Sequence, residues 1–271
     1  RYGWFPSISG GWVPTQYDWY RNLLPFNNFL KFRASWGRVG NDRLKDENGN
    51  DIRFPYLTTL GNVSSTWGTG LAENRTGSMN LKWEVSTKTN FGIDARFFDD
   101  KVDMTVDFFH TKTTDIFQRR ANIPDEGGLS NVLPYANIGS MKSWGMDGTL
   151  AYTHTFNKDM ALTVRGNFTH AENEVIYWEQ SGVNYPYQSN SGVPYKVQRG
   201  LIALGLFKDE DDIKSSPKQT FMDNYRPGDI KYKDVNGDGK IDKDDVVPLN
   251  YSAVPFIQYG FALDWNYKAF R

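Results

Sequence analysis

The residues with the clearest capacity for chemistry lie in the acidic segment 234–245, which reads DVNGDGKIDKDD. Oxygen-bearing side chains stand at its first, third, fifth, ninth and twelfth positions, glycine at the sixth, and the seventh residue can offer a backbone carbonyl. This is the spacing by which a loop surrounds a hard cation such as Ca²⁺. The predicted metal ligands are Asp234, Asn236, Asp238, Lys240 through its carbonyl, Asp242 and Asp245.

This segment departs from the usual calcium loop at its last ligand, because Asp245 is shorter than the bidentate Glu normally found there. The alternative is a solvated acidic turn of the Asp-Gly and Asn-Gly type. The flanks do not predict paired helices: a short strand pattern ending at Tyr232 precedes the segment, and Pro248 follows it. We therefore expect a clasp that stiffens a loop, rather than a calcium sensor that moves helices.

The sequence contains no motif of an enzyme active site and no predicted catalytic residue. GxSxG, HExxH and phosphate-loop motifs are absent, and no GxGxxG follows a strand. His110, His154 and His170 fall on separate strand patterns, where we expect girdle or surface residues rather than metal ligands. The acidic runs Asp99–Asp100 and Glu210–Asp212 are interpreted as a turn and a solvated loop, and catalytic carboxylates are the alternative.

Composition narrows the class of protein. The 271 residues carry a net charge of −1 without a basic run, which gives no general attraction to nucleic acid. Mean hydropathy is −0.61, and no apolar stretch approaches the roughly 20 residues of a spanning helix. Cysteine is absent, which excludes disulfides and thiolate sites and suits a bacterial envelope protein. Because the chain starts at Arg1 inside a strand pattern, we expect a fragment or a processed piece.

Nearly every periodic segment alternates apolar and polar residues, which predicts an all-β fold. In 101–111, for example, Val102, Met104, Val106 and Phe108 alternate with acidic and hydroxyl side chains. Seven strands are predicted: Tyr2–Trp12, Asn28–Arg38, Trp83–Phe97, Lys101–Thr111, Trp144–Phe156, Met160–Thr169, and a last one from Ile257.

Two architectures fit this alternation: a soluble sandwich, and a transmembrane barrel with its apolar face toward lipid. Strands of about ten residues favour the barrel. So do full charges on the polar faces, at Lys31, Arg33, Lys88, Arg96, Asp94, Asp103 and Asp107. Aromatic residues at the ends of the apolar rows also favour it, as a membrane-interface belt would. The basic lumenal residues could set the charge of a passage or pair with the aspartates across the sheet.

The connections alternate between short and long, as in outer-membrane barrels with short periplasmic turns and long outside loops. Residues 98–101 and 157–159 are short; residues 39–82, 114–142 and 172–252 are long and hydrophilic. The segment Pro14–Asn27 is an exception of intermediate length. Seven strands cannot close a bacterial barrel, so we expect these residues to be one part of a larger barrel.

The predicted outside loops are rich in aromatic side chains that could stack on a sugar, contact a peptide, pack the loop or meet a partner protein. These residues are Trp67, Tyr177, Trp178, Tyr185, Tyr187 and Tyr195.

Four segments resemble the SusC/RagA-like TonB-dependent outer-membrane transporters of Bacteroidetes. Arg1–Trp12 is similar to the family's RYGxFPSxSxGW, and Leu30–Asn41 to its LKLRASYGxxGN. Pro227–Asp242 resembles PGDikyxDvNgDGxId. Asn137–Asp147 resembles NiGxmxNkGvE, with Ser-Trp in place of Asn-Lys and Asp in place of Glu.

The resemblance implies that residues 1–271 are about seven strands of a 22-stranded barrel, and that 172–252 is a long extracellular loop carrying the motif 234–245. It implies an active importer of oligosaccharides or peptides in the outer membrane, which is not an enzyme. The implied partners are a SusD-like surface lipoprotein, the TonB complex through a missing N-terminal part, membrane lipid and the substrate. Nothing in the residues identifies the substrate.

Two other functions stay open. The first is a soluble, calcium-dependent, carbohydrate-binding β-sandwich, which would fractionate without detergent. The second is a glycoside hydrolase, which would cleave a glycan with two carboxylates.

Overall fold

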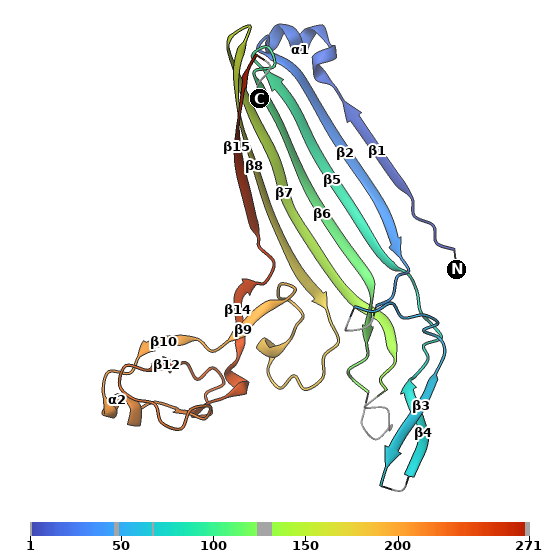
Figure 1. Ribbon diagram of the computed structural model, residues 1–271, viewed down its shortest axis with the longest axis vertical. Helices are drawn as coiled ribbons and strands as arrows, with labels where there is room; N and C mark the ends of the chain where they lie inside the picture. Colours follow the sequence, from blue (N-terminus) through green and yellow to red (C-terminus); the bar gives the residue numbers. More distant parts are fainter. Residues whose placement is uncertain (1, 46–48, 67, 124–131, 269–271) are drawn as a thin grey trace.

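The computed structural model describes the chain except for residues 1, 46–48, 67, 124–131 and 269–271. Its dominant element is one antiparallel sheet of seven strands in the order β1-β2-β5-β6-β7-β8-β15, which confirms the seven predicted strands (Figure 1). The strands are β1 (Ser7–Trp12), β2 (Asn27–Asn41), β5 (Glu84–Phe97), β6 (Val102–Arg119), β7 (Tyr135–Asn157), β8 (Met160–Tyr177) and β15 (Ile257–Tyr267). Its two outer strands are not paired with each other, so the sheet is an open segment of a barrel wall.

Four strands are longer than their apolar patterns predict, and one of them is β2, which continues to Asn41 instead of ending at Arg38. β6 and β7 stay paired through Arg119 and Tyr135, and β8 continues to Tyr177, so parts of the predicted loops are strand. The prediction was wrong there because backbone pairing continues where the side chains no longer alternate with an apolar face. β1 is shorter than predicted and begins after Pro6, which has no N–H for the ladder.

Short and long connections lie at opposite ends of the sheet (Figure 1). At the short end, the connection between β1 and β2 contains the 3₁₀ turn η1 (Pro14–Gln16) and the helix α1 (Asp18–Leu23), which the sequence analysis missed. Turns after Phe97 and Asn157 lie at the same end. The Phe98–Asp100 turn has three consecutive positive φ angles, and Asn28 hydrogen-bonds Asp99, so the acidic pair is a turn as predicted.

The long end carries two projecting structures (Figure 1). One is the hairpin β3 (Thr59–Ser65) and β4 (Gly68–Arg75). The other lies between β8 and β15 and consists of small paired strands, one short helix and two 3₁₀ turns. Its elements are η3 (Pro186–Gln188), β9 (Val197–Gly200), β10 (Ala203–Leu206), α2 (Glu210–Lys214), β11 (Lys218–Gln219), β12 (Ile230–Tyr232), β13 (Lys240–Ile241), η4 (Lys243–Asp245) and β14 (Val247–Ser252).

The acidic run 210–212 belongs to helix α2, not to an irregular loop. Asp209 caps the helix by accepting the backbone N–H of Asp212, and three acidic residues occupy its first turn. Carboxylates at a helix N-terminus are stabilised by the free N–H groups there, which explains the short helix. Asp212 is also paired with Lys231 at 2.8 Å, so this carboxylate holds the loop together.

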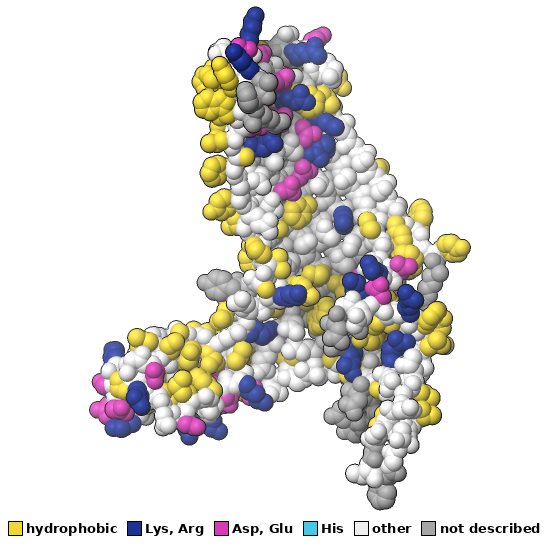
Figure 2. All heavy atoms as spheres, viewed as in Figure 1, with side chains coloured by type: hydrophobic (Ala, Val, Ile, Leu, Met, Phe, Trp, Pro, Cys, Tyr) yellow, Lys and Arg dark blue, Asp and Glu magenta, His cyan; other side chains and the backbone are white. Residues whose placement is uncertain are grey.

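The apolar face of the sheet is exposed, which distinguishes a membrane wall from half of a sandwich. On β15, Tyr259 and Phe261 are 80% and 81% exposed, and Leu263 and Trp265 are also exposed. In a sandwich these side chains would form the core. Hydrophobic side chains project along one edge of the sheet, and charged side chains gather on its other face (Figure 2).

The height of this apolar face fits a bilayer. On β7 it runs from Trp144 to Phe156, which is about 40 Å along the strand. With a strand tilt of about 45°, it covers about 28 Å, close to the band of about 25 Å in outer-membrane barrels. No helix in the described part of the chain is long and apolar enough to cross a membrane.

Candidate functional site

The polar face of the sheet carries an ion-pair network across three strands. Arg33 on β2 donates through Nε to Asp94 at 2.8 Å and through Nη2 to Asp94 and Asp107, both at 2.9 Å. Gly92 of β5 stands between Arg33 and Asp107 in the register. A Cβ at Gly92 would lie 2.6 Å from the Arg33 guanidinium carbon and from Asp107 Oδ1. The missing side chain therefore lets the arginine cross the middle strand.

The other predicted lumenal cations behave differently. Arg96 lies 3.9 Å from both Asp100 and Asp103, and its guanidinium covers the Phe29 ring. Within the described residues, Lys31 and Lys88 form no ion pair. Of the two predicted roles, pairing applies to the arginines, while the lysines leave positive charge on the lumenal face.

The segment 234–245 folds as a loop closed by its own carboxylates. Asp234 accepts the backbone N–H groups of Gly237 at 2.6 Å and Gly239 at 2.8 Å. Gly239, the predicted turning point, has φ +83°, and Gly237 has φ +78°. These left-handed conformations favour glycine over residues that carry a Cβ.

The second half of this loop is anchored by Asp245, which is fully buried. Its carboxylate accepts the backbone N–H of Val235 at 2.7 Å and of Asp242 at 2.9 Å, so it joins both ends of the loop. Ile241, the residue between Lys240 and Asp242, is also fully buried and gives the loop an apolar anchor. The shorter carboxylate at the twelfth position therefore holds backbone amides.

Two predicted loop aromatics support this segment. The rings of Tyr185 and Tyr187 stack with centroids 5.3 Å apart. The Tyr187 hydroxyl donates to the Asp244 carbonyl at 2.6 Å, and Asn236 donates to the Tyr185 hydroxyl at 3.2 Å. Burial, with the negative charges nearby, raises the pKa of Tyr187. These two tyrosines therefore pack the loop.

The oxygen donors of the loop suit a hard cation in type and number. Among the described residues, no three His, Asp or Glu side chains converge closely enough to hold a metal ion. The Asp234 and Asp245 carboxylates are directed to backbone amides, although a carboxylate has about four lone-pair sites and keeps acceptor capacity. Calcium binding by Asp234, Asn236, Asp238, Lys240, Asp242 and Asp245 thus stays a prediction.

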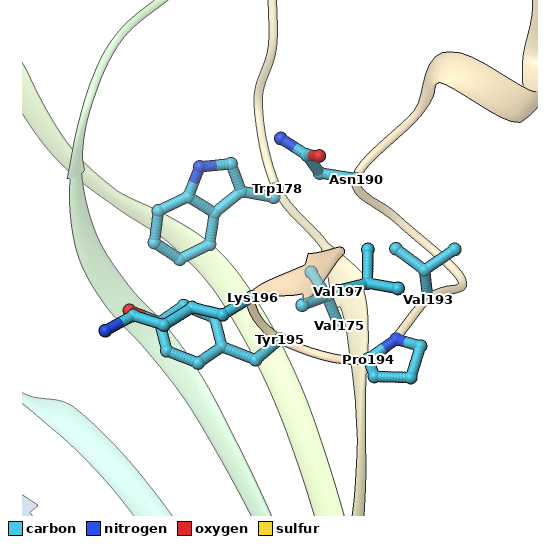
Figure 3. Close-up of a pocket in the computed structure, with 8 residues that line it drawn as sticks. All are labelled: Val175, Trp178, Asn190, Val193, Pro194, Tyr195, Lys196 and Val197. Atoms are coloured by element: carbon cyan, nitrogen blue, oxygen red, sulfur yellow. The ribbon is translucent and has the colours of Figure 1, made fainter. Parts of the chain in front are cut away.

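A pocket of about 230 Å³ lies where β8 enters its long loop (Figure 3). The Trp178 indole stands on one side, and Tyr195 and Lys196 stand on the other. Aliphatic side chains and one amide complete the wall. The lining residues are Val175, Trp178, Asn190, Val193, Pro194, Tyr195, Lys196 and Val197.

The pocket wall is held by hydrogen bonds between the Tyr195 backbone and side chains of two neighbouring strands. Asn173 of β8 accepts the Tyr195 N–H at 2.6 Å, and Ser252 of β14 donates to the Tyr195 carbonyl at 3.0 Å. Lys196 has φ +54°, an uncommon conformation for a residue with a side chain. Arg199 donates to the Tyr187 carbonyl and to Asn190, which connects the pocket to the tyrosines of the acidic loop.

The predicted loop aromatics thus divide by position. Trp178 and Tyr195 line the pocket, Tyr185 and Tyr187 pack against the acidic loop, and Tyr177 is exposed. Trp67 lies outside the described residues. Val175, Asn190 and Arg199 were not predicted, because no spacing rule links a strand residue to positions in an irregular loop.

The three histidines lie apart on the outward face of β6, β7 and β8. His154 packs edge-to-face on Phe156 with ring centroids 4.5 Å apart, as expected for a girdle residue. His170 lies 3.3 Å from Glu172. His110 is opposite Trp144 in the register of β6 and β7.

Comparisons with known proteins identify the family to which this barrel segment belongs. Residues 1–268 match the family described as TonB dependent receptor-like, beta-barrel. The chain is 28% identical to TonB-dependent receptor P26 of Formosa agariphila, over 99% of this chain and 27% of that protein. It is 25% identical to TonB-dependent receptor SusC of Bacteroides thetaiotaomicron, over 90% of this chain and 24% of that protein.

Solved structures share the fold. The RagAB peptide importer in its open-open state matches with a TM-score of 0.71 and 21% identity, over 98% of this chain and 27% of that chain. Its closed-closed state matches with a TM-score of 0.68 and 22% identity, over 98% and 28%. The chain thus spans about a quarter of the length of the relatives it matches. It belongs to the TonB dependent receptor-like β-barrel family, is similar to SusC in sequence and to the RagAB importer in fold, and is an outer-membrane protein.

Proposed function

We propose that this chain forms part of the wall and outer loops of an active importer of oligosaccharides or peptides. The observation that carries the proposal is a family match along residues 1–268, together with a sheet that is apolar outside and charged inside. A wall of this kind separates lipid from a hydrated passage. The named relatives add support, because one is SusC and another is a peptide importer.

A partner protein is part of this proposal. We expect a SusD-like lipoprotein to cover the long end of the barrel, where β3–β4 and the structure between β8 and β15 project beyond the sheet (Figure 1). Energy would come from the TonB complex through an N-terminal part of the full-length protein. Co-purification from membranes should recover the lipoprotein, and its absence after mild detergent extraction would contradict this part of the proposal.

The pocket beside Trp178 is the proposed place of substrate contact in these residues. Its two aromatic rings offer stacking and apolar contact, while Asn190 and Lys196 offer hydrogen-bond donors. This combination suits either a sugar ring or a peptide side chain. Trp178→Ala should weaken substrate binding to the transporter at least tenfold, and exposed Tyr177→Ala, on the neighbouring residue, is the matched control.

Growth tests the substrate class. A strain without the transporter gene should lose growth on either a peptide mixture or an oligosaccharide as sole nutrient, and regain it with the full-length gene. Detergent-free recovery of the protein in the soluble fraction would instead support the β-sandwich alternative. The 80% exposure of Tyr259 makes that outcome unexpected, since this surface needs lipid.

We also propose that the loop 234–245 binds Ca²⁺ and stiffens the loop near the partner. The oxygen donors, the glycine turns and the buried anchor at Ile241 support this proposal. Asp234→Ala with Asp238→Ala should abolish calcium binding and increase proteolysis within residues 228–246. Unchanged calcium content and unchanged protease resistance in the double variant would rule out the site.

A further inference from the structure

Three basic side chains lie in one transverse row across the outward face of the sheet. The register places Arg38 of β2 opposite Thr87 of β5, Thr87 opposite Lys112 of β6, and Lys112 opposite Lys142 of β7. With strands about 4.8 Å apart, the row extends over about 15 Å. The pairing is regular at each of these positions, so the row does not depend on a bulge.

The row lies on the lipid-facing side. Trp36, His110 and Trp144 stand two residues from Arg38, Lys112 and Lys142 on the same strands, and residues two apart share a face. Further along the same face come Phe108 and Met146, which begin the apolar band. On each of these strands the order is therefore apolar, then aromatic, then basic, toward the long loops.

The charge of this row is only partly neutralised. Lys142 pairs with Glu174 of β8 at 3.0 Å and lies over the Trp144 ring at 5.4 Å. Within the described residues, Arg38 and Lys112 form no ion pair. The acidic side chains on this face, Glu172 and Glu174, both stand on β8 at one flank, and Glu172 lies 3.3 Å from the His170 imidazole.

A basic row just beyond an aromatic belt lies at the level of lipid headgroups. Long Lys and Arg side chains keep their stems on apolar surface while their charged ends reach the polar layer. Anionic lipids attract such residues, and phosphate is a good partner for guanidinium and ammonium groups. We infer that Arg38, Lys112 and Lys142 bind the phosphate groups of anionic lipid in the outer leaflet. The lipid-facing band continues directly into this row, which favours lipid over a protein partner.

Removing two charges tests the inference in the full-length transporter. Arg38→Gln with Lys112→Gln removes the two cations of this row that form no ion pair within the described part of the chain. Lys31→Gln with Lys88→Gln is the matched control, because it removes two lumenal cations that form no ion pair with any residue the structure describes. Each protein is placed in nanodiscs of phosphatidylcholine, with or without lipid A, and its unfolding temperature and retained lipid A are measured.

Lipid A should raise the unfolding temperature of the wild-type protein and of the lumenal control. The outward double variant should lose this shift and retain at least tenfold less lipid A, since each basic residue near a membrane surface is worth about fivefold. Equal responses in the outward variant and the wild type would overturn the inference, and so would equal losses in both variants. An equal stabilisation by inorganic phosphate would show a soluble-anion site instead. Substrate uptake, measured in the same variants, tests the proposed function separately.

Discussion

At the scale of single residues, one glycine decides how the lumenal charges are arranged. Alternation places Arg33, Asp94 and Asp107 on one face, but adjacent strands alone do not join the first and third. Gly92 leaves the space through which Arg33 reaches Asp107. Arg33 and its two aspartate partners are all partly buried, so solvent screens the attraction between their charges less than it would at the surface.

Gly92→Ala should destabilise the barrel by about 1–3 kcal/mol, because the new Cβ overlaps the guanidinium and displaces it from Asp107. The loss of stability is measured as a lower unfolding temperature, at which the heated barrel changes its mobility on gel electrophoresis. Gly10→Ala on β1 is the control, since a Cβ there meets no atom within 4 Å. Equal unfolding temperatures for the two variants would contradict the proposed role of Gly92.

A second residue, Asp212, makes the outer loop sensitive to acid. The hydrogen bond from Lys231, and then the backbone N–H of Lys208, hold the pKa of Asp212 below its usual value. A lowered folded-state pKa contributes stability above about pH 4, and this is lost as the pH falls through the folded-state pKa. Hydrogen exchange around α2 should therefore accelerate in acid. Asp212→Asn should remove that pH step, whereas exposed Asp211→Asn should preserve it.

At the scale of elements, the acidic loop is a closed unit held by one buried carboxylate. Asp245 connects the start of the loop at Val235 with the turn at Asp242. The stacked tyrosines and Arg199 then connect this unit to the pocket beside β8. Loop and pocket are therefore one structural assembly, although about 60 residues of sequence separate Trp178 from Asp238.

Asp245→Ala should loosen this assembly even without calcium. The buried Asp245 carboxylate accepts hydrogen bonds from the backbone N–H groups of Val235 and Asp242. Both groups would lose this partner, at a cost of about 1–3 kcal/mol. Limited proteolysis should then cut within residues 228–246, in calcium-free buffer as well. Asp211→Ala, on an exposed turn of α2, should leave the cleavage pattern unchanged. Resistance of the Asp245 variant would show that the loop is held by other contacts.

At the scale of the whole molecule, the sheet is a wall with two environments rather than one side of a core. Buried hydrophobic residues in the described part are few, and several of them, such as Phe207 and Ile241, belong to the outer loops. The apolar face of the sheet is instead exposed, on the side that contacts membrane lipid. Stability of the sheet then comes from its continuous backbone ladder and from the bilayer.

Consecutive residues on β7 test this assignment of faces. Leu150→Arg places a charge on the exposed outward face and should destabilise membrane insertion by about 2–4 kcal/mol. Thr149→Arg places the same charge on the lumenal face, where it should be tolerated. Folding yield into liposomes measures both. If the chain were a soluble sandwich with its apolar face turned to a core, the folding yield of both variants would be independent of lipid.

The extent of prediction differs between the sheet and the site. Period-two alternation indicated all seven strands, because each strand carries its two environments in adjacent residues. It did not indicate the extension of β8 to Tyr177, where backbone pairing with β7 continues without an apolar face. It also did not indicate the helix α1, which local hydrogen bonds hold. Charged residues were assigned to the correct face, and pairing with the aspartates was one of their two predicted roles. The reach of Arg33 across β5 to Asp107 was not indicated, because Gly92 acts only through space.

The sequence alone determined that the sheet has one apolar and one polar face, because apolar and polar residues alternate along each strand. It also determined the alternation of short and long connections and the spacing of the oxygen donors in 234–245. All of these are local properties of the chain. Only the tertiary structure decided which distant residues share a site or a row, such as Trp178 and Tyr195 in one pocket, and Arg38 and Lys112 on either side of Thr87. Register and loop packing set these positions, and both depend on long-range pairing that no single segment encodes.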